Sequence, residues 1–353
     1  MKNGNKRLIQ SARKVYKLWQ KTTRRDRAEG QVIVMPYRGF TNGQHFFLKG
    51  RVLEDQNIQV QANDSKFTNL INTFKRFESD ELPNAEIAVH INEQTFSIIS
   101  DEEGYFSLYE KLENPLPVND QFWKKALVEL LQLPGRKFKT TTTASFFYPT
   151  TKAKFGVISD IDDTVLRTHV TSTLGLKMLY ATLLSNAHQR RPMEGIVELL
   201  QALARGPKGN AHNPFFYVSN SPWNLYDLLI QFMEVQQLPR GPILLRDYGL
   251  SPANFSAAFQ EHKQTSMGTI LKTYPDLPFI LLGDTGSKDV DHYLAIAQEY
   301  PGQIKTIYIR KLGDTNNVER VTQLITSATN VDILLVRNTE EIWQDVRKKG
   351  YVG

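Results

Sequence analysis

The stretch FGVISDIDDT, residues 155–164, is an apolar run that leads directly into a cluster of acidic residues. Further apolar runs, with helical patterns between them, follow at residues 215–218, 243–245, 279–282, 304–309 and 331–336. A parallel sheet that is covered by helices on both faces produces such a succession of buried strands. The sequence from residue 151 onward therefore predicts an α/β fold with a doubly wound parallel sheet, in which ligands bind beyond the carboxyl ends of the strands.

Asp160 and Asp162 come directly after the first of these strands. A phosphomonoester resists attack because its oxygens are negatively charged, so its hydrolysis needs a fixed nucleophile, a cation and donors that spread the charge. An aspartate can attack phosphorus without losing a proton, and it forms an acyl phosphate that water later hydrolyses. We expect Asp160 to be this nucleophile. Crowding by acidic neighbours suits Asp162 to protonate the leaving oxygen and then to activate the water.

Two other interpretations of the acidic cluster are a solvated turn and a calcium-binding loop. A calcium loop needs a third acid or Asn at the next alternate position, then a Gly and a distal Glu. Thr164 and Val165 stand in those places, which speaks against calcium. The solvated turn stays open when this motif is taken alone.

Polar residues also follow two later strands. Ser219 and Asn220 come after residues 215–218, where a hydroxyl and backbone donors can hold a phosphate oxygen. Asp284, with Asp289 five residues further on, follows residues 279–282 and can complete a magnesium shell with Asp160. Lys263, upstream of that strand, can neutralise the phosphate.

On these residues the chain resembles the haloacid dehalogenase superfamily, whose four motifs match in order. Asp160, Asp162 and Thr164 match the first motif, Ser219 the second, Lys263 the third, and Asp284 with Asp289 the fourth. The resemblance implies a Rossmann-like fold and a phosphate site that includes Thr164. It also implies Mg²⁺ held by Asp160, the backbone carbonyl of Asp162 and Asp284, with Asp289 nearby.

A narrower resemblance covers most of the chain and rests on longer stretches, namely SDIDDT at 159–164, SNSPW at 219–223, LRDYG at 245–249, HK at 262–263, GDTG at 283–286, YRG at 37–39 and GRVL at 50–53. These are similar to the actin-patch-associated phosphatidate phosphatase catalytic domain family and its bacterial members. The family implies magnesium-dependent hydrolysis of phosphatidate to diacylglycerol and phosphate. The segment at 285–288 departs from the family pattern, which puts outer contacts of the metal site in doubt but not its ligands.

The chain divides into three parts on its patterns: residues 1–28, 29–150 and 151–353. The middle part predicts a small β-sandwich, with strands expected at 32–35, 46–53, 86–91 and 138–147 and helices expected at 64–79 and 120–132. It shows no cluster of acids, bases and ligands, so we expect a structural or membrane-docking role. In the third part, an apolar insertion near 165–195 predicts either a small cap that meets acyl chains or a helix packed on the sheet.

The first part, residues 1–28, predicts a basic amphipathic helix, because it holds ten Lys and Arg residues against the single acid Asp26. Much of the net charge of +6 therefore lies here. The helix either binds an anionic membrane surface or packs on the protein body. We expect no nucleic-acid partner.

The composition narrows the location and leaves two alternative functions open. The chain has no cysteine, which fits a reducing compartment, and no apolar run long enough to cross a bilayer, so we expect a cytoplasmic protein that can also associate peripherally with membrane. The alternatives to a lipid phosphatase are a phosphatase of a soluble phosphomonoester and a catalytically idle lipid- or protein-binding module. The complete set of acids together with Lys263 speaks against the idle module.

Overall fold

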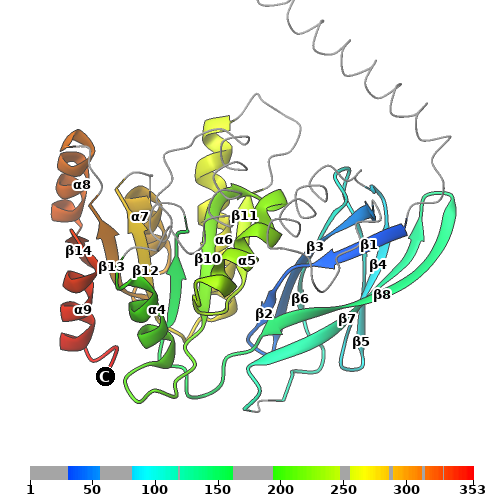
Figure 1. Ribbon diagram of the computed structural model, residues 1–353, viewed down its shortest axis with the longest axis horizontal. Coiled ribbons are helices and arrows are strands. Elements are labelled where there is room, and N and C mark those ends of the chain that lie inside the picture. Colours follow the sequence, from blue (N-terminus) through cyan, green and yellow to red (C-terminus); the bar gives the residue numbers. More distant parts are fainter. Residues whose placement is uncertain are drawn as a thin grey trace, which may run out of the picture.

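The computed structural model describes residues 31–55, 82–117, 120–161, 194–246, 255–285, 289–311, 315–328 and 330–353, which form two sheets lying side by side (Figure 1). The expected helices at 1–28 and 64–79 lie outside these residues. So does nearly all of the expected cap near 165–195, and so do Asp162 and Thr164.

Sheet B is the parallel sheet that the apolar runs predict. Its strands are β9 (Gly156–Ser159), β10 (Phe215–Pro222), β11 (Ile243–Arg246), β12 (Phe279–Asp284), β13 (Ile304–Arg310) and β14 (Asp332–Val336). They lie in the order β11-β10-β9-β12-β13-β14, and every pairing is parallel. Strands β10 and β11 are added in turn on one side of β9, and β12, β13 and β14 are then added on its other side. The strand order therefore reverses beside β9, which is where open sheets of this kind bind ligands.

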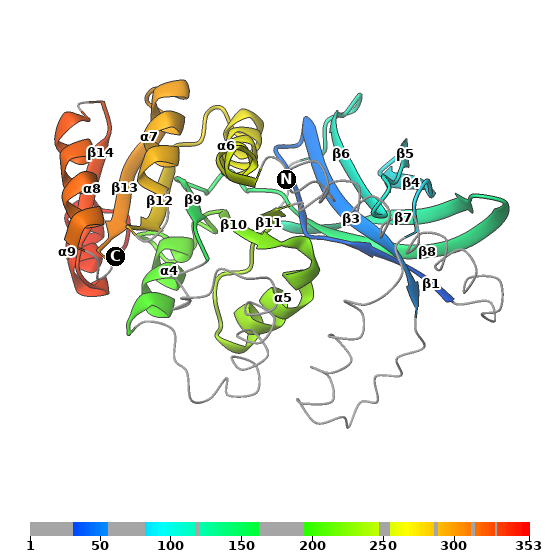
Figure 2. The ribbon, with the colours of Figure 1, turned by 90° about the horizontal axis from the view of Figure 1, so that it is seen from above.

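Helices cover both faces of sheet B, as the prediction of a doubly wound sheet requires (Figure 2). The helices are α4 (Ile196–Arg205), η1 (Trp223–Leu225), α5 (Tyr226–Val235), α6 (Phe255–Thr273), α7 (Asp289–Glu299), α8 (Thr315–Ser327) and α9 (Thr339–Lys348). Buried side chains of α4, α5 and α9 form one apolar core with the sheet, and those of α6, α7 and α8 form another. The described helices include none that is both long and apolar enough to cross a bilayer.

Sheet A is formed by the middle part of the chain. Its strands are β1 (Gln31–Pro36), β2 (Gly39–Thr41), β3 (His45–Asp55), β4 (Glu86–Ile91), β5 (Gln94–Ile99), β6 (Tyr105–Lys111), β7 (Trp123–Leu133) and β8 (Arg136–Phe147). They surround their own apolar core. All pairings are antiparallel except the parallel one between β2 and β8.

The predicted β-sandwich is wrong in its hydrogen bonding, because the strands of sheet A form one continuous sheet. The eleven-residue strand β3 pairs with β6 along one edge and with β1 and β2 along the other. The two sheets of a sandwich would not be joined by such backbone pairing. The sheet curls until β5 and β6 come into contact. A strongly twisted sheet that curls in this way encloses a core without a second sheet.

The predicted helix at 120–132 is also wrong, because residues 123–133 form β7. Lys, Ala, Leu, Glu and Gln favour helix, and they dominate this stretch. However, Ala126, Val128 and Leu130 alternate with more exposed positions, and β7 is paired on both edges, by β4 and β8. Pairing along two edges and burial of every second side chain outweigh the weak helical propensity.

Sheet A packs against the end of sheet B that carries β10 and β11 (Figure 2). Phe40 of β2 meets Phe216 of β10 edge-on, with ring centroids 5.2 Å apart. Tyr274, at the end of α6, donates a hydrogen bond to the Thr41 carbonyl at 3.0 Å. The interface between the sheets therefore combines aromatic packing with polar contacts, and its aromatic side chains continue into both cores of sheet B.

Candidate active site

The carboxyl ends of three neighbouring strands bring the candidate residues to one edge of sheet B. Ser159 lies opposite Tyr217 of β10 and opposite Leu282 of β12. Asp160 follows Ser159 by one residue, so it lies between the ends of β10 and β12, and its N–H donates to the Leu282 carbonyl at 2.9 Å. With only 1% of its surface exposed, the carboxylate is held inside the protein at the point of strand reversal.

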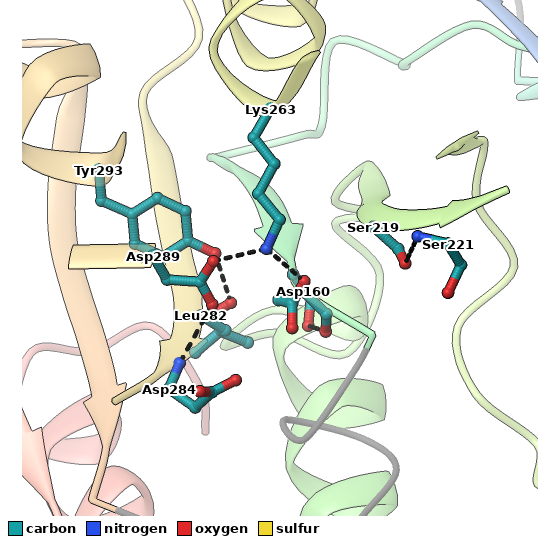
Figure 3. A network of polar contacts seen from close by, with 9 residues as sticks. Asp160, Ser219, Ser221, Lys263, Leu282, Asp284, Asp289 and Tyr293 are labelled. Carbon is teal, nitrogen blue, oxygen red and sulfur yellow. Dashed lines mark hydrogen bonds and ion pairs between the residues drawn. The ribbon is translucent and has the colours of Figure 1, made fainter. Parts of the chain in front are cut away.

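Lys263 of helix α6 reaches into this edge and joins two of the predicted acids (Figure 3). Its ammonium Nζ donates to Asp160 Oδ1 at 2.7 Å and to Asp289 Oδ1 at 2.5 Å, and all three side chains are buried. Burial by itself lowers the pKa of Lys263, but the charges and hydrogen bonds of the two carboxylates outweigh burial and raise it. The ammonium therefore stays protonated throughout the physiological pH range.

Asp289 begins helix α7 and turns its carboxylate back toward the end of β12. Its Oδ2 accepts a hydrogen bond from the Asp284 N–H at 3.3 Å (Figure 3). Gly283 makes this close approach possible. A Cβ at that position would lie 2.8 Å from Asp289 Oδ2 and 2.7 Å from Tyr293 Cε2, which is closer than real Cβ atoms come. A glycine before Asp284 is thus required by the packing of α7 on β12.

Three buried carboxylates, those of Asp160, Asp284 and Asp289, each offer an oxygen within 4.8 Å of the others. Lys263 donates hydrogen bonds to two of them, Asp160 and Asp289. Burial first, and then the charges of these carboxylates, raise the pKa of the nearby Tyr293 hydroxyl well above its ordinary value. Buried carboxylate oxygens that lie this close together are the ligands that hard divalent cations prefer. The residues present therefore fit a divalent cation such as Mg²⁺.

Ser219 and Asn220 lie on the last part of β10, next to Asp160. Ser219 is fully buried, and its Oγ accepts a hydrogen bond from the Ser221 N–H at 2.9 Å (Figure 3). Strand β10 continues to Pro222 and passes without a break into the short helix η1. Two of the predicted phosphate-binding residues, Ser219 and Asn220, are therefore presented by an extension of the strand.

Two further polar residues, one next to Lys263 in the chain and one at the end of β11, had no role assigned from the sequence. His262 precedes Lys263 on α6, and burial first, and then the charges of Lys49 and Lys263, lower its pKa to about 4. Its ring is therefore neutral at neutral pH. Arg246 ends β11 opposite Pro222 and is 4% exposed. The available signal for Arg246 was the position of a cation directly after an apolar run, whereas no pattern marked the half-buried His262.

The structure thus brings together Asp160, Lys263, Asp284 and Asp289, and it places Ser219 and Asn220 at the end of the adjoining strand. The roles of Asp162 and Thr164 stay predictions, since both residues lie outside the described part of the chain. Asp162 is two residues beyond Asp160, so it follows the same strand end in the sequence.

Comparison with known proteins finds a family and two proteins to which part of this chain is similar. Residues 155–311 match the family described as the catalytic domain of Phosphatidate phosphatase APP1. The chain is 35% identical over 156 residues to Phosphatidate phosphatase APP1 of Saccharomyces cerevisiae, a match that covers 44% of this chain and 25% of the yeast protein. It is 27% identical over 216 residues to an uncharacterized protein of Schizosaccharomyces pombe, covering 61% of this chain and 34% of that protein. The chain therefore spans only about a quarter to a third of these relatives.

Among solved structures, a carbohydrate acetylesterase from Xanthomonas citri aligns over 90% of this chain and 74% of its own, at 11% identity and a TM-score of 0.30. That similarity is too low to indicate a shared fold. The family match, in contrast, spans Asp160, Ser219, Lys263, Asp284 and Asp289. Residues 155–311 of this chain are therefore similar to the family of the Phosphatidate phosphatase APP1 catalytic domain.

Proposed function

We propose that this protein is a magnesium-dependent phosphomonoester hydrolase in which Asp160 is transiently phosphorylated and phosphatidate is the substrate. The observation that carries the proposal is the position of the Lys263 ammonium, 2.7 Å from Asp160 and 2.5 Å from Asp289, in a buried cluster that also holds Asp284. A nucleophilic carboxylate, a fixed cation and further carboxylates for a metal are the parts that phosphoryl transfer needs.

In the first half-reaction, a carboxylate oxygen of Asp160 forms a bond to phosphorus while the bond from phosphorus to the ester oxygen breaks. Lys263 holds the Asp160 carboxylate in place and offsets the charge of the incoming phosphate. Asp162 gives its proton to the departing alkoxide, so that a neutral alcohol leaves. Ser219 and the backbone after it donate hydrogen bonds to the phosphoryl oxygens.

In the second half-reaction, Asp162 takes a proton from water as the water oxygen attacks the phosphorus of the aspartyl phosphate. The bond between phosphorus and Asp160 breaks, inorganic phosphate leaves, and both aspartates return to their starting states. Asp160, Asp284, Asp289 and the Asp162 carbonyl would hold the Mg²⁺, which when bound offsets the negative charge of the phosphoryl group.

The arrangement of sheet B supports placing this chain in the haloacid dehalogenase superfamily. The proposed nucleophile follows β9, the strand beside which the order reverses, while Asp284 ends the neighbouring strand β12 and Asp289 begins the helix after it. Thr164 belongs to the proposed phosphate site, together with Ser219 and Asn220. The insertion near 165–195 is the proposed cap.

The choice of phosphatidate rests on the yeast relative and on the matched family, both of which are named for phosphatidate phosphatase. A peripheral contact of the basic residues 1–28 with an anionic membrane would bring the site to a lipid substrate. We also propose that the protein is cytoplasmic and that residues 1–28, 29–150 and 151–353 form its three parts. A soluble phosphomonoester is the alternative substrate.

The function is tested by assaying wild type, Asp160→Asn and Asp276→Asn with Mg²⁺ on phosphatidate vesicles and on soluble phosphomonoesters. Asp276 is exposed in the turn before β12, so its variant controls for loss of a carboxylate outside the site. We expect wild type and Asp276→Asn to release phosphate from vesicles, and Asp160→Asn to be inactive. Turnover of soluble esters alone would exclude phosphatidate, and full activity of Asp160→Asn would exclude the nucleophile.

The aspartyl phosphate has a separate test. Protein that is mixed with substrate and quenched in acid should carry phosphate that hydroxylamine releases, because hydroxylamine cleaves acyl phosphates and leaves phosphoesters of Ser or Thr intact. Asp160→Asn should carry none. Active protein without hydroxylamine-sensitive phosphate would mean that water attacks the substrate directly.

A further inference from the structure

Sheet A makes a concentrated set of contacts with the four residues that follow the phosphate-binding end of β10. The ring of Tyr37 stacks on Trp223, with centroids 4.5 Å apart and planes 7° from parallel. Tyr37 also lies 4.2 Å from the ring of Tyr226, and the Arg38 N–H donates to the Tyr226 hydroxyl at 2.7 Å. These residues of sheet A thus hold both ends of the segment 223–226.

Asn224, between those two ends, is held by two donors from sheet A. Its Oδ1 accepts from Arg51 Nη1 at 3.2 Å and from the Tyr105 hydroxyl at 3.0 Å. Arg51 is itself fixed, because its Nε donates to the Glu103 carbonyl at 3.0 Å and its guanidinium lies 4.5 Å from the centre of the Tyr105 ring. The clamp on Asn224 is therefore built from side chains that have little freedom to move.

The segment 223–226 is joined directly to the phosphate-binding end of β10, with no loop between them. Strand β10 ends at Pro222 and η1 begins at Trp223, so Ser219 and Ser221 are joined to Trp223 by extended backbone alone. Pro222 restricts that connection further. Lys49 of β3 lies 4.9 Å from the Trp223 ring, and its charge acts on His262, which precedes Lys263 on α6. Sheet A therefore reaches the neighbourhood of the catalytic centre itself.

From this geometry we infer that Tyr37 and Arg51 of sheet A are positioning residues for phosphate binding. They fix Trp223 and Asn224, and through these the Ser219 hydroxyl and the backbone donors after it. This role rests on the proposed function of Ser219 as a phosphate ligand. Residues of the middle part of the chain would then position the phosphate ligands, whereas the sequence of this part predicts only a structural or membrane-docking role.

A purely structural interface would stabilise the protein wherever its contacts fall, so the test compares contacts at two places. Tyr37→Leu and Asn224→Ala remove contacts at the clamp and change no charge. Tyr274→Phe removes one hydrogen bond between the same sheets, at the Thr41 carbonyl, away from residues 219–226. Tyr37→Phe keeps the stacked ring. Arg51 is a poorer probe, because the loss of its charge would weaken anion binding even without a change of position.

The readout is the dissociation constant of inorganic phosphate, measured by titration calorimetry on the full chain with Mg²⁺, well below the unfolding temperature. We expect Tyr37→Leu and Asn224→Ala to weaken phosphate binding about 10-fold, because small displacements of binding groups cost this much or more. Tyr37→Phe should bind like wild type. Tyr274→Phe should unfold at a lower temperature and keep wild-type affinity.

Equal affinity for phosphate in Tyr37→Leu, Asn224→Ala and wild type would overturn the inference. So would a loss of affinity in Tyr274→Phe as large as that at the clamp. Wild-type protein that binds phosphate but does not hydrolyse any phosphomonoester would refute the proposed function alone, and the affinities of the variants would still decide the positioning role. Wild-type protein that neither binds phosphate nor hydrolyses esters would refute both.

Discussion

Lys263 and Asp160, 103 residues apart in the chain, form a buried ion pair with an Nζ to Oδ1 distance of 2.7 Å. The pair joins the helix that covers one face of sheet B to the strand at which the sheet reverses its order. Since Asp289 shares the same ammonium, one side chain organises two of the acids of the site.

Replacing Lys263 by Met should impair both stability and activity. Loss of the ammonium leaves Asp160 and Asp289 buried without their partner, which should lower the free energy of unfolding in urea by about 3–5 kcal/mol. The rate of phosphate release should fall by about 10²–10³-fold. Lys349→Met is the control, because Lys349 pairs with Asp345 and Asp332 at a more exposed place and should cost far less. Equal losses in the two variants would contradict a special role of Lys263.

Magnesium should stabilise the protein through the acidic cluster. A ligand that binds only the folded state at about 100 times its dissociation constant adds about 2.7 kcal/mol to the free energy of unfolding. We expect such a rise for wild type, and its loss in Asp284→Asn. Asp291→Asn is the control, because Asp291 lies in the first turn of the same helix as Asp289 but pairs with Arg320 at the surface. A full magnesium effect in Asp284→Asn would exclude Asp284 as a ligand.

Gly283→Ala should disturb the site although it changes no polar group. The new Cβ would lie 2.8 Å from Asp289 Oδ2, so the carboxylate or the helix must move, at a cost of about 1–3 kcal/mol. The magnesium-induced rise in unfolding temperature should shrink as well. In Gly268→Ala the nearest atom outside the helix backbone is the Tyr300 hydroxyl at 3.1 Å, and the magnesium effect should persist. A variant Gly283→Ala that binds Mg²⁺ normally would show that Asp289 need not approach Asp284 so closely.

His262 should make the protein lose stability in mild acid. Its pKa falls from 6.5 to about 4 on folding, chiefly because the ring is buried. Between these two values the unfolded chain binds the proton and the folded protein does not, so stability falls as the pH drops through this window and the loss levels off below about 4. Once the pH is below both pKa values, His262 lowers the free energy of unfolding by about 3 kcal/mol. The free energy of unfolding of His262→Gln should fall less than that of wild type between pH 6.5 and 4, and identical slopes would refute this assignment.

Strand positions in sheet B were predictable because each is a short apolar run, and every predicted run coincides with a strand from β9 to β14. Sheet A was less predictable. Strand β7 is buried on one face only, so its apolar pattern is weaker, and it carries residues that favour helix. The pairing of β7 with β8, the next strand of the chain, and with β4, which lies far from it in the sequence, decided its structure.

The sequence by itself determined which residues follow the strands of sheet B, and thereby the acids at one edge of the sheet, because an apolar run and the polar residue after it are adjacent in the chain. Only the tertiary structure decided that Lys263 lies between Asp160 and Asp289, and that Tyr37 stacks on Trp223. Those contacts join residues more than 25 positions apart. They depend on how helices and sheets pack, which no periodicity within one element records.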